Sequence, residues 1–168
     1  CQALADYLTI QEEFGDLKGL NLTYIGDGNN VANSLMMCGS MLGVNVTVCS
    51  PKGFEPTLKI LEKAKSLSKF DAKIFLSNDP VESSKDSHIL YTDVWASMGQ
   101  EEEQLKRRKI FQKYCVNEKL IELADEKVIF LHCLPAHRGE EVTDDAIESN
   151  SSRIFEQAEN RLHIQQAL

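Results

Sequence analysis

Short apolar runs alternate with longer amphipathic segments along the whole chain. The runs are rich in β-branched and aromatic residues and predict five strands, over 21–26, 45–50, 72–77, 87–93 and 127–133. Each run is nearly continuous, which is typical of a parallel strand buried on both faces. The intervening segments predict helices near 2–15, 30–42, 54–68, 101–112, 117–124 and 154–166. We expect Pro56 to occupy the first turn of the third helix.

This alternation predicts one α/β domain over residues 1–168. Strands separated by helical segments of this length form βαβ units. We therefore expect a doubly wound open parallel sheet of about five strands with helices on both faces, a Rossmann-like fold. Ligands of such sheets bind beyond the carboxyl ends of the strands, so the loops that follow the strands are where chemistry is expected.

Composition and charge exclude several classes of partner. No apolar run approaches the roughly 18 residues that span a bilayer. The formal net charge is −8, which disfavours nucleic acid and anionic membranes as partners. The one dense basic cluster, Lys106–Lys109, follows Glu101–Glu103 and is interpreted as a solvated helix with acid–base pairs four residues apart.

The cysteines favour a reducing compartment. There are five, at positions 1, 38, 49, 115 and 133, without a C-x-x-C pair. The odd number and the wide spacing argue against a disulfide framework and against a zinc site. We expect a cytoplasmic protein, and the sequence implies no metal or organic cofactor.

The loop after the first strand, "GDGNN", allows two interpretations. Gly26 and Gly28 follow a strand and open a helix, as in dinucleotide-binding proteins. However, Val31 stands where the third glycine belongs, and no acidic residue follows the second strand. The better interpretation places the amides of Asn29 and Asn30 at a helix N-terminus, where the helix dipole favours a carboxylate; Asn29 also fits a simple N-cap.

Two later strand ends carry reactive groups. Asp93 precedes a loop with Ser97 and Gly99, which suits either a partner for a substrate cation or a helix cap. Cys133 ends the fifth strand, and His132 beside it points to the opposite face. A Cys–His pair would therefore need another histidine, and a buried structural thiol is the alternative.

Taken in order, these motifs resemble the ornithine carbamoyltransferases over essentially the whole chain. The matching stretches are "CQALADYLTIQEEFG", "GDGNN", "PKGFEP", "SNDP", "DVWASMGQE", "HCLPAHRGEEV" and "AENRLH". The resemblance implies transfer of the carbamoyl group of carbamoyl phosphate to the δ-amine of L-ornithine, giving citrulline and phosphate, in arginine biosynthesis. It further implies a homotrimeric parent enzyme, of which this chain is the ornithine-binding half. We expect the N-terminal carbamoyl-phosphate domain to be absent and this half alone to be inactive.

The resemblance also implies how ornithine is held. Asn30 hydrogen-bonds the amino-acid head, and Asp93 with Ser97 holds the α-ammonium. Met98 lies in a loop that closes over the substrate. Cys133 lies beside the δ-amine, and a thiolate–carboxylate pair with Asp93 takes or relays the proton that the amine must lose.

For carbamoyl phosphate, the resemblance implies four contacts. Cys133 lies next to the reacting group, and Leu134 offers its backbone carbonyl to the carbamoyl NH₂. Arg161 and Gln2 reach the carbamoyl phosphate from the two ends of the chain. His137 and Arg138 are expected to be structural or peripheral.

Two alternatives remain open at this point. One is a related transferase that uses putrescine or an acetylated ornithine, against which the intact "DVWASMG" argues. A nucleotide-binding module is the other, against which the missing acidic residue after the second strand argues.

Overall fold

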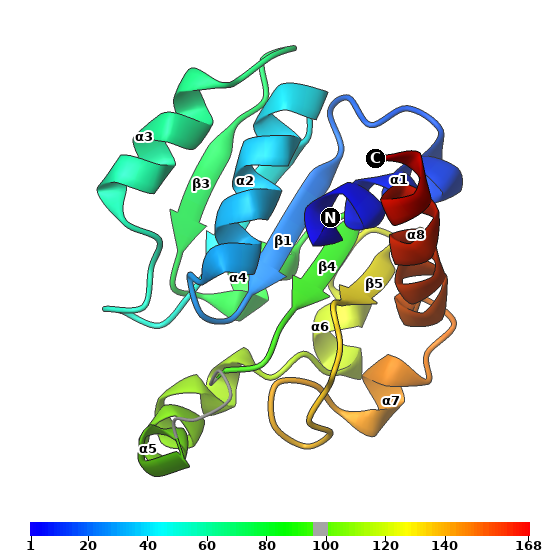
Figure 1. The fold of residues 1–168 in the computed structure, drawn as a ribbon. Coiled ribbons are helices and arrows are strands. Elements are labelled where there is room, and N and C mark those ends of the chain that lie inside the picture. Colours follow the sequence, from blue (N-terminus) through cyan, green and yellow to red (C-terminus); the bar gives the residue numbers. More distant parts are fainter. Residues whose placement is uncertain (96–100) are drawn as a thin grey trace.

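Five parallel strands form one open sheet in the spatial order β3-β2-β1-β4-β5 (Figure 1). The structure is a computed structural model that describes residues 1–95 and 101–168. The strands are β1 (Asn21–Ile25), β2 (Asn45–Cys49), β3 (Ile74–Ser77), β4 (Ile89–Thr92) and β5 (Ile129–His132). β1 pairs in parallel with both β2 and β4, so the direction of winding reverses between β1 and β4. The predicted doubly wound parallel sheet is confirmed.

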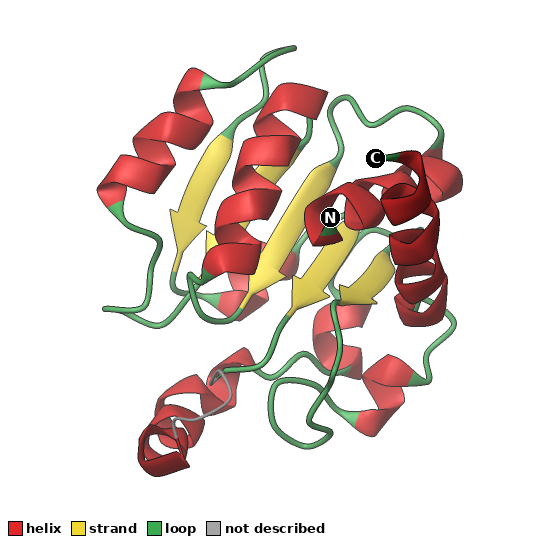
Figure 2. Ribbon diagram, in the orientation of Figure 1, coloured by secondary structure: helices red, strands yellow, loops and turns green. Residues whose placement is uncertain are grey.

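Helices cover both faces of the sheet (Figure 2). One layer consists of α1 (Gln2–Phe14), α2 (Asn30–Leu42), α3 (Leu58–Ser66) and α8 (Ile154–Ala167). The opposite layer contains α4 (Pro80–Ser84), α6 (Glu118–Glu122) and α7 (Asp144–Ile147). α5 (Glu101–Phe111) and the 3₁₀ turn η1 (Gln112–Tyr114) follow β4, and α5 lies beyond the carboxyl ends of the strands (Figure 1).

Alternate residues of each strand enter two separate cores. Tyr91 and Leu131 pack under α1 and α2, whereas Leu90 and Phe130 pack under α6 and α7. Both sets are apolar because helices cover both faces, which explains the continuous apolar runs in the sequence. Within the part of the chain that the structure describes, no helix is long and apolar enough to cross a membrane.

Several details differ from the sequence prediction. β3 is an edge strand, so Phe75 is 51% exposed and the expected burial on both faces is wrong there. The third helix begins at Leu58 after the N-cap Thr57, and Pro56 lies before the helix instead of in its first turn. The sequence pattern does not predict α4 and α7, which have five and four residues and display no full helical period; α6 also has five, but it lies within the longer segment 117–124 predicted as a helix.

The loop between β1 and α2 rests on the segment 51–56. The Gly28 N–H donates to the Phe54 carbonyl over 2.8 Å. A Cβ atom on Gly28 would lie 2.4 Å from the backbone nitrogen of Pro56. The protein's own backbone therefore requires this glycine, and the close approach that a pyrophosphate would make is already taken by residues 54–56. This packing counts against the dinucleotide interpretation.

We expect Gly28→Ala to lower the free energy of unfolding by roughly 3 kcal/mol, the upper end of the usual cost of overpacking, because two backbone segments must separate. Gly15→Ala is the matched control, since nothing lies within 4 Å of the added Cβ and only its positive φ of 77° opposes the change. That control should cost about 1 kcal/mol. Urea denaturation at 25 °C measures both, and equal losses would contradict the packing argument.

Candidate active site

Three side chains meet beyond the carboxyl ends of β1, β4 and β5. Asn29 Nδ2 donates to Asp93 Oδ2 over 2.8 Å, and Cys133 Sγ donates to Asp93 Oδ1 over 3.1 Å. Asp93 is only 8% exposed, and none of the ion pairs recorded among the described residues involves it. A nearly buried carboxylate with hydrogen-bond donors but no cation suits a ligand cation. Asp93 and Cys133 are in contact, as the resemblance implies, and their roles remain predictions.

Asn29 holds both the helix and the carboxylate. Its Oδ1 accepts the N–H groups of Val31 and Ala32 at 2.9 and 3.2 Å, so it is the N-cap of α2. Because the oxygen is engaged in capping, the amide nitrogen is directed at Asp93. The N-cap interpretation is confirmed, and this one side chain also fixes the position of Asp93. Sequence reasoning missed that second contact because it joins residues 64 positions apart.

Cys133 is a thiol in this site. Burial raises the pKa of Cys133 far above its usual value, and the negative charge of Asp93 raises it further. The short contact fits this state, since a thiol donates to a carboxylate and a thiolate would repel it. The expected thiolate–carboxylate pair is therefore corrected to a thiol–carboxylate pair, in which the carboxylate is the charged member.

His132 belongs to the opposite face of β5, as its position beside Cys133 predicts. Its Nδ1 accepts the Leu134 N–H over 2.9 Å, and its Nε2 lies 3.3 Å from Glu141 Oε1. Nδ1 therefore faces the backbone of the turn, and Nε2 faces Glu141. His132 is 1% exposed and is held by these contacts away from the thiol. It therefore orders the turn after β5 and forms no Cys–His pair.

The turn after β5 has an unusual backbone. Leu134 has a φ of 54°, in the left-handed region that residues with a side chain rarely adopt, and the Leu134–Pro135 peptide bond is cis. A left-handed conformation of this kind is found more often at binding sites than elsewhere. Further along, Arg138 pairs with Asp144 and Glu148, which fits the structural role expected for it.

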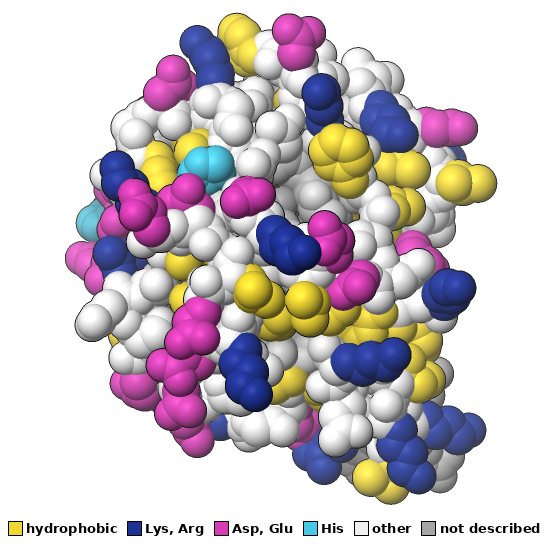
Figure 3. All heavy atoms as spheres, turned by 180° about the vertical axis from the view of Figure 1, so that it is seen from behind, with side chains coloured by type: hydrophobic (Ala, Val, Ile, Leu, Met, Phe, Trp, Pro, Cys, Tyr) yellow, Lys and Arg dark blue, Asp and Glu magenta, His cyan; other side chains and the backbone are white. Residues whose placement is uncertain are grey.

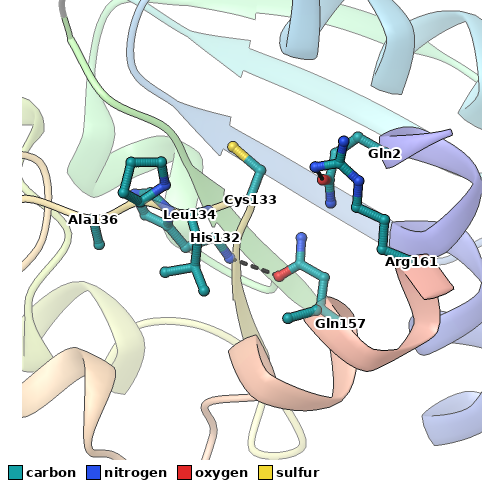
Figure 4. A pocket seen from close by; sticks show the side chains of 9 residues that line it. Gln2, His132, Cys133, Leu134, Ala136, Gln157 and Arg161 are labelled. Atoms are coloured by element: carbon teal, nitrogen blue, oxygen red, sulfur yellow. Dashed lines mark hydrogen bonds between the residues drawn. The ribbon is translucent and has the colours of Figure 1, made fainter.

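A hollow of about 590 Å³ lies beside Cys133 (Figure 4). Gln2 from α1 and Arg161 from α8 line one side, and Arg161 Nη1 donates to Gln2 Oε1 over 3.1 Å. Cys133 and Leu134 line the other side. The structure thus brings together the four residues that the resemblance assigns to carbamoyl phosphate. The remaining lining residues are His132, Pro135, Ala136, Gln157 and Ala158.

The other predicted ornithine contacts are placed differently. Asn30 is exposed and lines another, smaller hollow together with Gln2. It contacts neither Asp93 nor Cys133 through any recorded hydrogen bond in the described residues, so its role as a ligand to the amino-acid head stays a prediction. Ser97 and Met98 lie outside the described residues.

The basic cluster of α5 is only partly the solvated surface that the sequence suggests. Dark blue side chains gather where α5 lies, at the lower right of the view from behind (Figure 3). Arg107, however, is partly buried, and its Nη1 lies 2.5 Å from Asp27 Oδ2 and 2.8 Å from the Trp95 carbonyl. Its guanidinium also stacks over Phe54. Arg107 thus ties α5 to the loops after β1 and β4 and is less solvated than the sequence suggests, whereas the predicted acid–base pairing within the helix stays a prediction.

Sequence reasoning also missed a buried polar group behind the hollow. Asp6, Tyr91 and Gln157 hydrogen-bond one another in the core, although nothing in their local sequence marks them as functional. The available signal is that Asp6 lies four residues before Ile10, on the apolar stripe of α1. Among the described residues, no group of three or more His, Cys, Asp or Glu side chains is arranged to hold a metal ion.

We expect the Cys133 thiol to react slowly with iodoacetamide at pH 8, while the exposed Cys1 in the same chain serves as the reference. Asp93→Asn removes a charge that raises the pKa of the Cys133 thiol. It should speed alkylation of Cys133 roughly tenfold for each unit by which this pKa falls. Mass spectrometry of the alkylated peptides gives both rates. Asp145→Asn, which removes an exposed carboxylate in α7, is the control. Equal rates in all three proteins would contradict the coupling of Asp93 to Cys133.

Comparison with known proteins places this geometry in a family. Residues 18–168 match the family described as aspartate/ornithine carbamoyltransferase, Asp/Orn binding domain. The chain is 62% identical over 168 residues to an ornithine carbamoyltransferase of Prochlorococcus marinus strain SARG, covering 53% of that protein. It is 56% identical to the enzyme of that name from strain MIT 9313, again covering 53%. An ornithine carbamoyltransferase structure from Pyrococcus furiosus superposes with a TM-score of 0.95 at 53% identity, covering 99% of this chain and 54% of that one.

The chain spans about half the length of the curated relatives it matches. The matched region includes the strands, the Asp93–Cys133 contact and Arg161, and the sheet order agrees with the predicted fold. The chain therefore belongs to the aspartate/ornithine carbamoyltransferase family, of which it carries the Asp/Orn-binding domain.

Proposed function

We propose that this chain binds L-ornithine at the carboxyl edge of the sheet for carbamoyl transfer. In the protein to which it belongs, the δ-amine of ornithine attacks the carbamoyl carbon of carbamoyl phosphate, giving citrulline and phosphate. The observation that carries the proposal is the Asp93 carboxylate, which is nearly buried, is hydrogen-bonded by Asn29 and Cys133, and forms no ion pair with any residue that the structure describes. The names of the relatives support ornithine as the substrate.

The electrostatics of the site favour a cationic amino acid. An ionised carboxylate held by neutral donors has unused capacity for charge-assisted hydrogen bonds, which are about twice as strong as neutral ones. The α-ammonium of ornithine fills that capacity at Asp93, with Ser97 as the second contact. Asn30 then hydrogen-bonds the amino-acid head from the start of α2, and Met98 belongs to the loop that closes over the substrate.

The chemistry requires a neutral amine at the thiol. The δ-ammonium loses one proton before its nitrogen attacks. The new C–N bond forms, the C–O bond to phosphate breaks with its electron pair leaving on phosphate, and the leaving phosphate takes up the second proton that the attacking nitrogen must lose. As a thiol, Cys133 donates to Asp93 and can accept an N–H of the amine through its sulfur lone pairs. The pair thus orients the amine and relays its proton toward the carboxylate, without a covalent bond to sulfur.

The hollow beside Cys133 is the proposed seat of the carbamoyl group. Arg161 supplies a positive charge and Gln2 an amide, while the Leu134 carbonyl is assigned to the carbamoyl NH₂. Cys133 borders this hollow and contacts Asp93, so the two substrates would meet at its sulfur. Holding two reactants in this way replaces a bimolecular step by a reaction between positioned groups.

Several wider features belong to the same proposal. We assign the main phosphate contacts to an N-terminal carbamoyl-phosphate domain, the assembly to a homotrimer and the role to arginine biosynthesis, all from the resemblance. Five free cysteines fit a cytoplasmic setting, since disulfides are rare there.

The chain can be joined to the part of the Prochlorococcus marinus strain SARG enzyme that it does not match. The assembled enzyme should form citrulline from L-ornithine and carbamoyl phosphate. Asp93→Asn should lower its kcat/KM for ornithine roughly 10- to 100-fold, the effect of losing a hydrogen bond to a charged group. Asp145→Asn should leave kcat/KM unchanged.

Putrescine and N-acetyl-L-ornithine test the substrate. Putrescine lacks the α-carboxylate, and the acetylated compound lacks the α-ammonium that Asp93 would hold. Faster turnover of either compound than of ornithine would contradict the proposed substrate. An unchanged kcat/KM in Asp93→Asn would contradict the assignment of the site.

A further inference from the structure

The carboxylate of Asp6 lies in the core and is hydrogen-bonded to residues that line the hollow. Asp6 in α1 is fully buried, and its Oδ1 accepts the side-chain amides of Gln2 and Gln157, each over 2.7 Å. The Tyr91 hydroxyl donates to its Oδ2 over 3.2 Å. Gln2 and Gln157 both line the hollow (Figure 4), so Asp6 is linked to the site on two sides.

The groups that contact Asp6 are neutral. The free amino group of Cys1 lowers the pKa of Asp6 in this chain, and joining the chain to a preceding segment replaces that charge by a neutral peptide group, so the pKa of Asp6 in the assembled enzyme is no lower. Arg161 of α8 lies beyond Gln2, whose oxygen accepts from it. The other titratable groups that interact with Asp6 are Tyr7 of α1, Cys38 of α2, Tyr91 of β4 and Cys133 of β5.

This arrangement is costly for the fold. Burial raises the pKa of Asp6 to about 6, so the group is mainly ionised at neutral pH in the core. Because the folded pKa lies above the ordinary value of 3.8, the group's contribution to stability is lost as pH rises from about 4 through 6. Neutral replacements of buried charges often stabilise a protein. Stability therefore does not explain why a carboxylate occupies this position.

We propose that Asp6 is a positioning residue that fixes the side-chain amide of Gln2 for carbamoyl phosphate. This inference rests on the proposed function, because Gln2 acquires its role from that reaction. Asp6 acts on the substrate only through Gln2.

The geometry gives the amide of Gln2 a single orientation. Its Nε2 donates to Asp6, which leaves Oε1 to accept from Arg161. A flipped amide would set Oε1 against the carboxylate and Nε2 against the guanidinium, so both contacts would become repulsive. The ionised Asp6 therefore presents Gln2 as an acceptor on the side of Arg161 and the hollow. Gln157 fixes Asp6 in turn, since its Oε1 accepts the His132 N–H of β5 over 2.9 Å.

In the assembled enzyme, Asp6→Asn should lower kcat/KM for carbamoyl phosphate roughly fivefold or more, because a neutral amide binds Gln2 more weakly and selects its orientation less. Gln2→Ala removes the group through which Asp6 acts. In that background, Asp6→Asn should have no further effect on kcat/KM, whereas a purely structural change would lower it by the same factor in both backgrounds. Asp145→Asn is again the control.

The pH dependence supplies a second readout, and taking ratios cancels the ionisation of the substrate. The ratio of kcat/KM between the unsubstituted enzyme and Asp6→Asn should rise as pH increases through the pKa of Asp6, which is about 6 in this chain and no lower in the assembled enzyme. The unsubstituted enzyme should lose kcat/KM at low pH as Asp6 becomes protonated. Tyr91→Phe removes a hydrogen bond that lowers the pKa of Asp6, so in this variant the loss of kcat/KM should begin at higher pH. This variant keeps the core volume and provides the test if Asp6→Asn fails to fold. Thermal unfolding should show Asp6→Asn at least as stable as the unsubstituted enzyme at pH 8.

The outcomes separate the two claims. An active unsubstituted enzyme with unchanged kcat/KM in Asp6→Asn, or with equal losses in the presence and absence of Gln2, overturns the inference and leaves the proposed function standing. An acid-side loss that Tyr91→Phe does not shift also overturns the inference. An inactive unsubstituted enzyme overturns the proposed function, and the role of Asp6 with it.

Discussion

The site depends on one carboxylate that is shared by three strand ends. Asp93 follows β4, Asn29 follows β1 and Cys133 follows β5, and the two hydrogen bonds to Asp93 hold these loops in one geometry. The donors keep the carboxylate in place without neutralising it. The site therefore holds a fixed negative charge with little water around it, where the attraction for a cation is stronger than at an open surface.

A second carboxylate, that of Asp6, is held by neutral hydrogen-bond donors in the core behind the site. Asp6 is held by neutral donors from α1, β4 and α8, and its charge sets the orientation of Gln2 rather than binding a ligand. The two carboxylates differ in surroundings: Asp93 borders the site, whereas Asp6 is sealed in the core. We propose that the protein tolerates these two poorly compensated charges for different reasons: Asp93 receives ornithine, and Asp6 orients Gln2 toward carbamoyl phosphate.

The sequence predicts the sheet well because each strand is a continuous apolar run, and it locates the site because ligands of doubly wound sheets bind at strand ends. The prediction fails where long-range packing decides the outcome. Pro56 lies outside α3 because its segment packs on Gly28, and Arg107 leaves the solvated surface for Asp27. The Cys133 thiol and the bonds of Asp6 also depend on burial and on partners distant in sequence, which no local pattern encodes.

Asp93, held by Asn29 and Cys133, is proposed to receive the cation of L-ornithine. A titration of the ¹⁵N-labelled chain with L-ornithine, followed by two-dimensional NMR, tests this binding at the level of single residues. We expect saturable shifts of the Asn29 side-chain amide and of the backbone amides next to Asp93 and Cys133, and their loss in Asp93→Asn. Saturable shifts confined to other parts of the chain, or the same shifts in Asp93→Asn, would contradict the proposal.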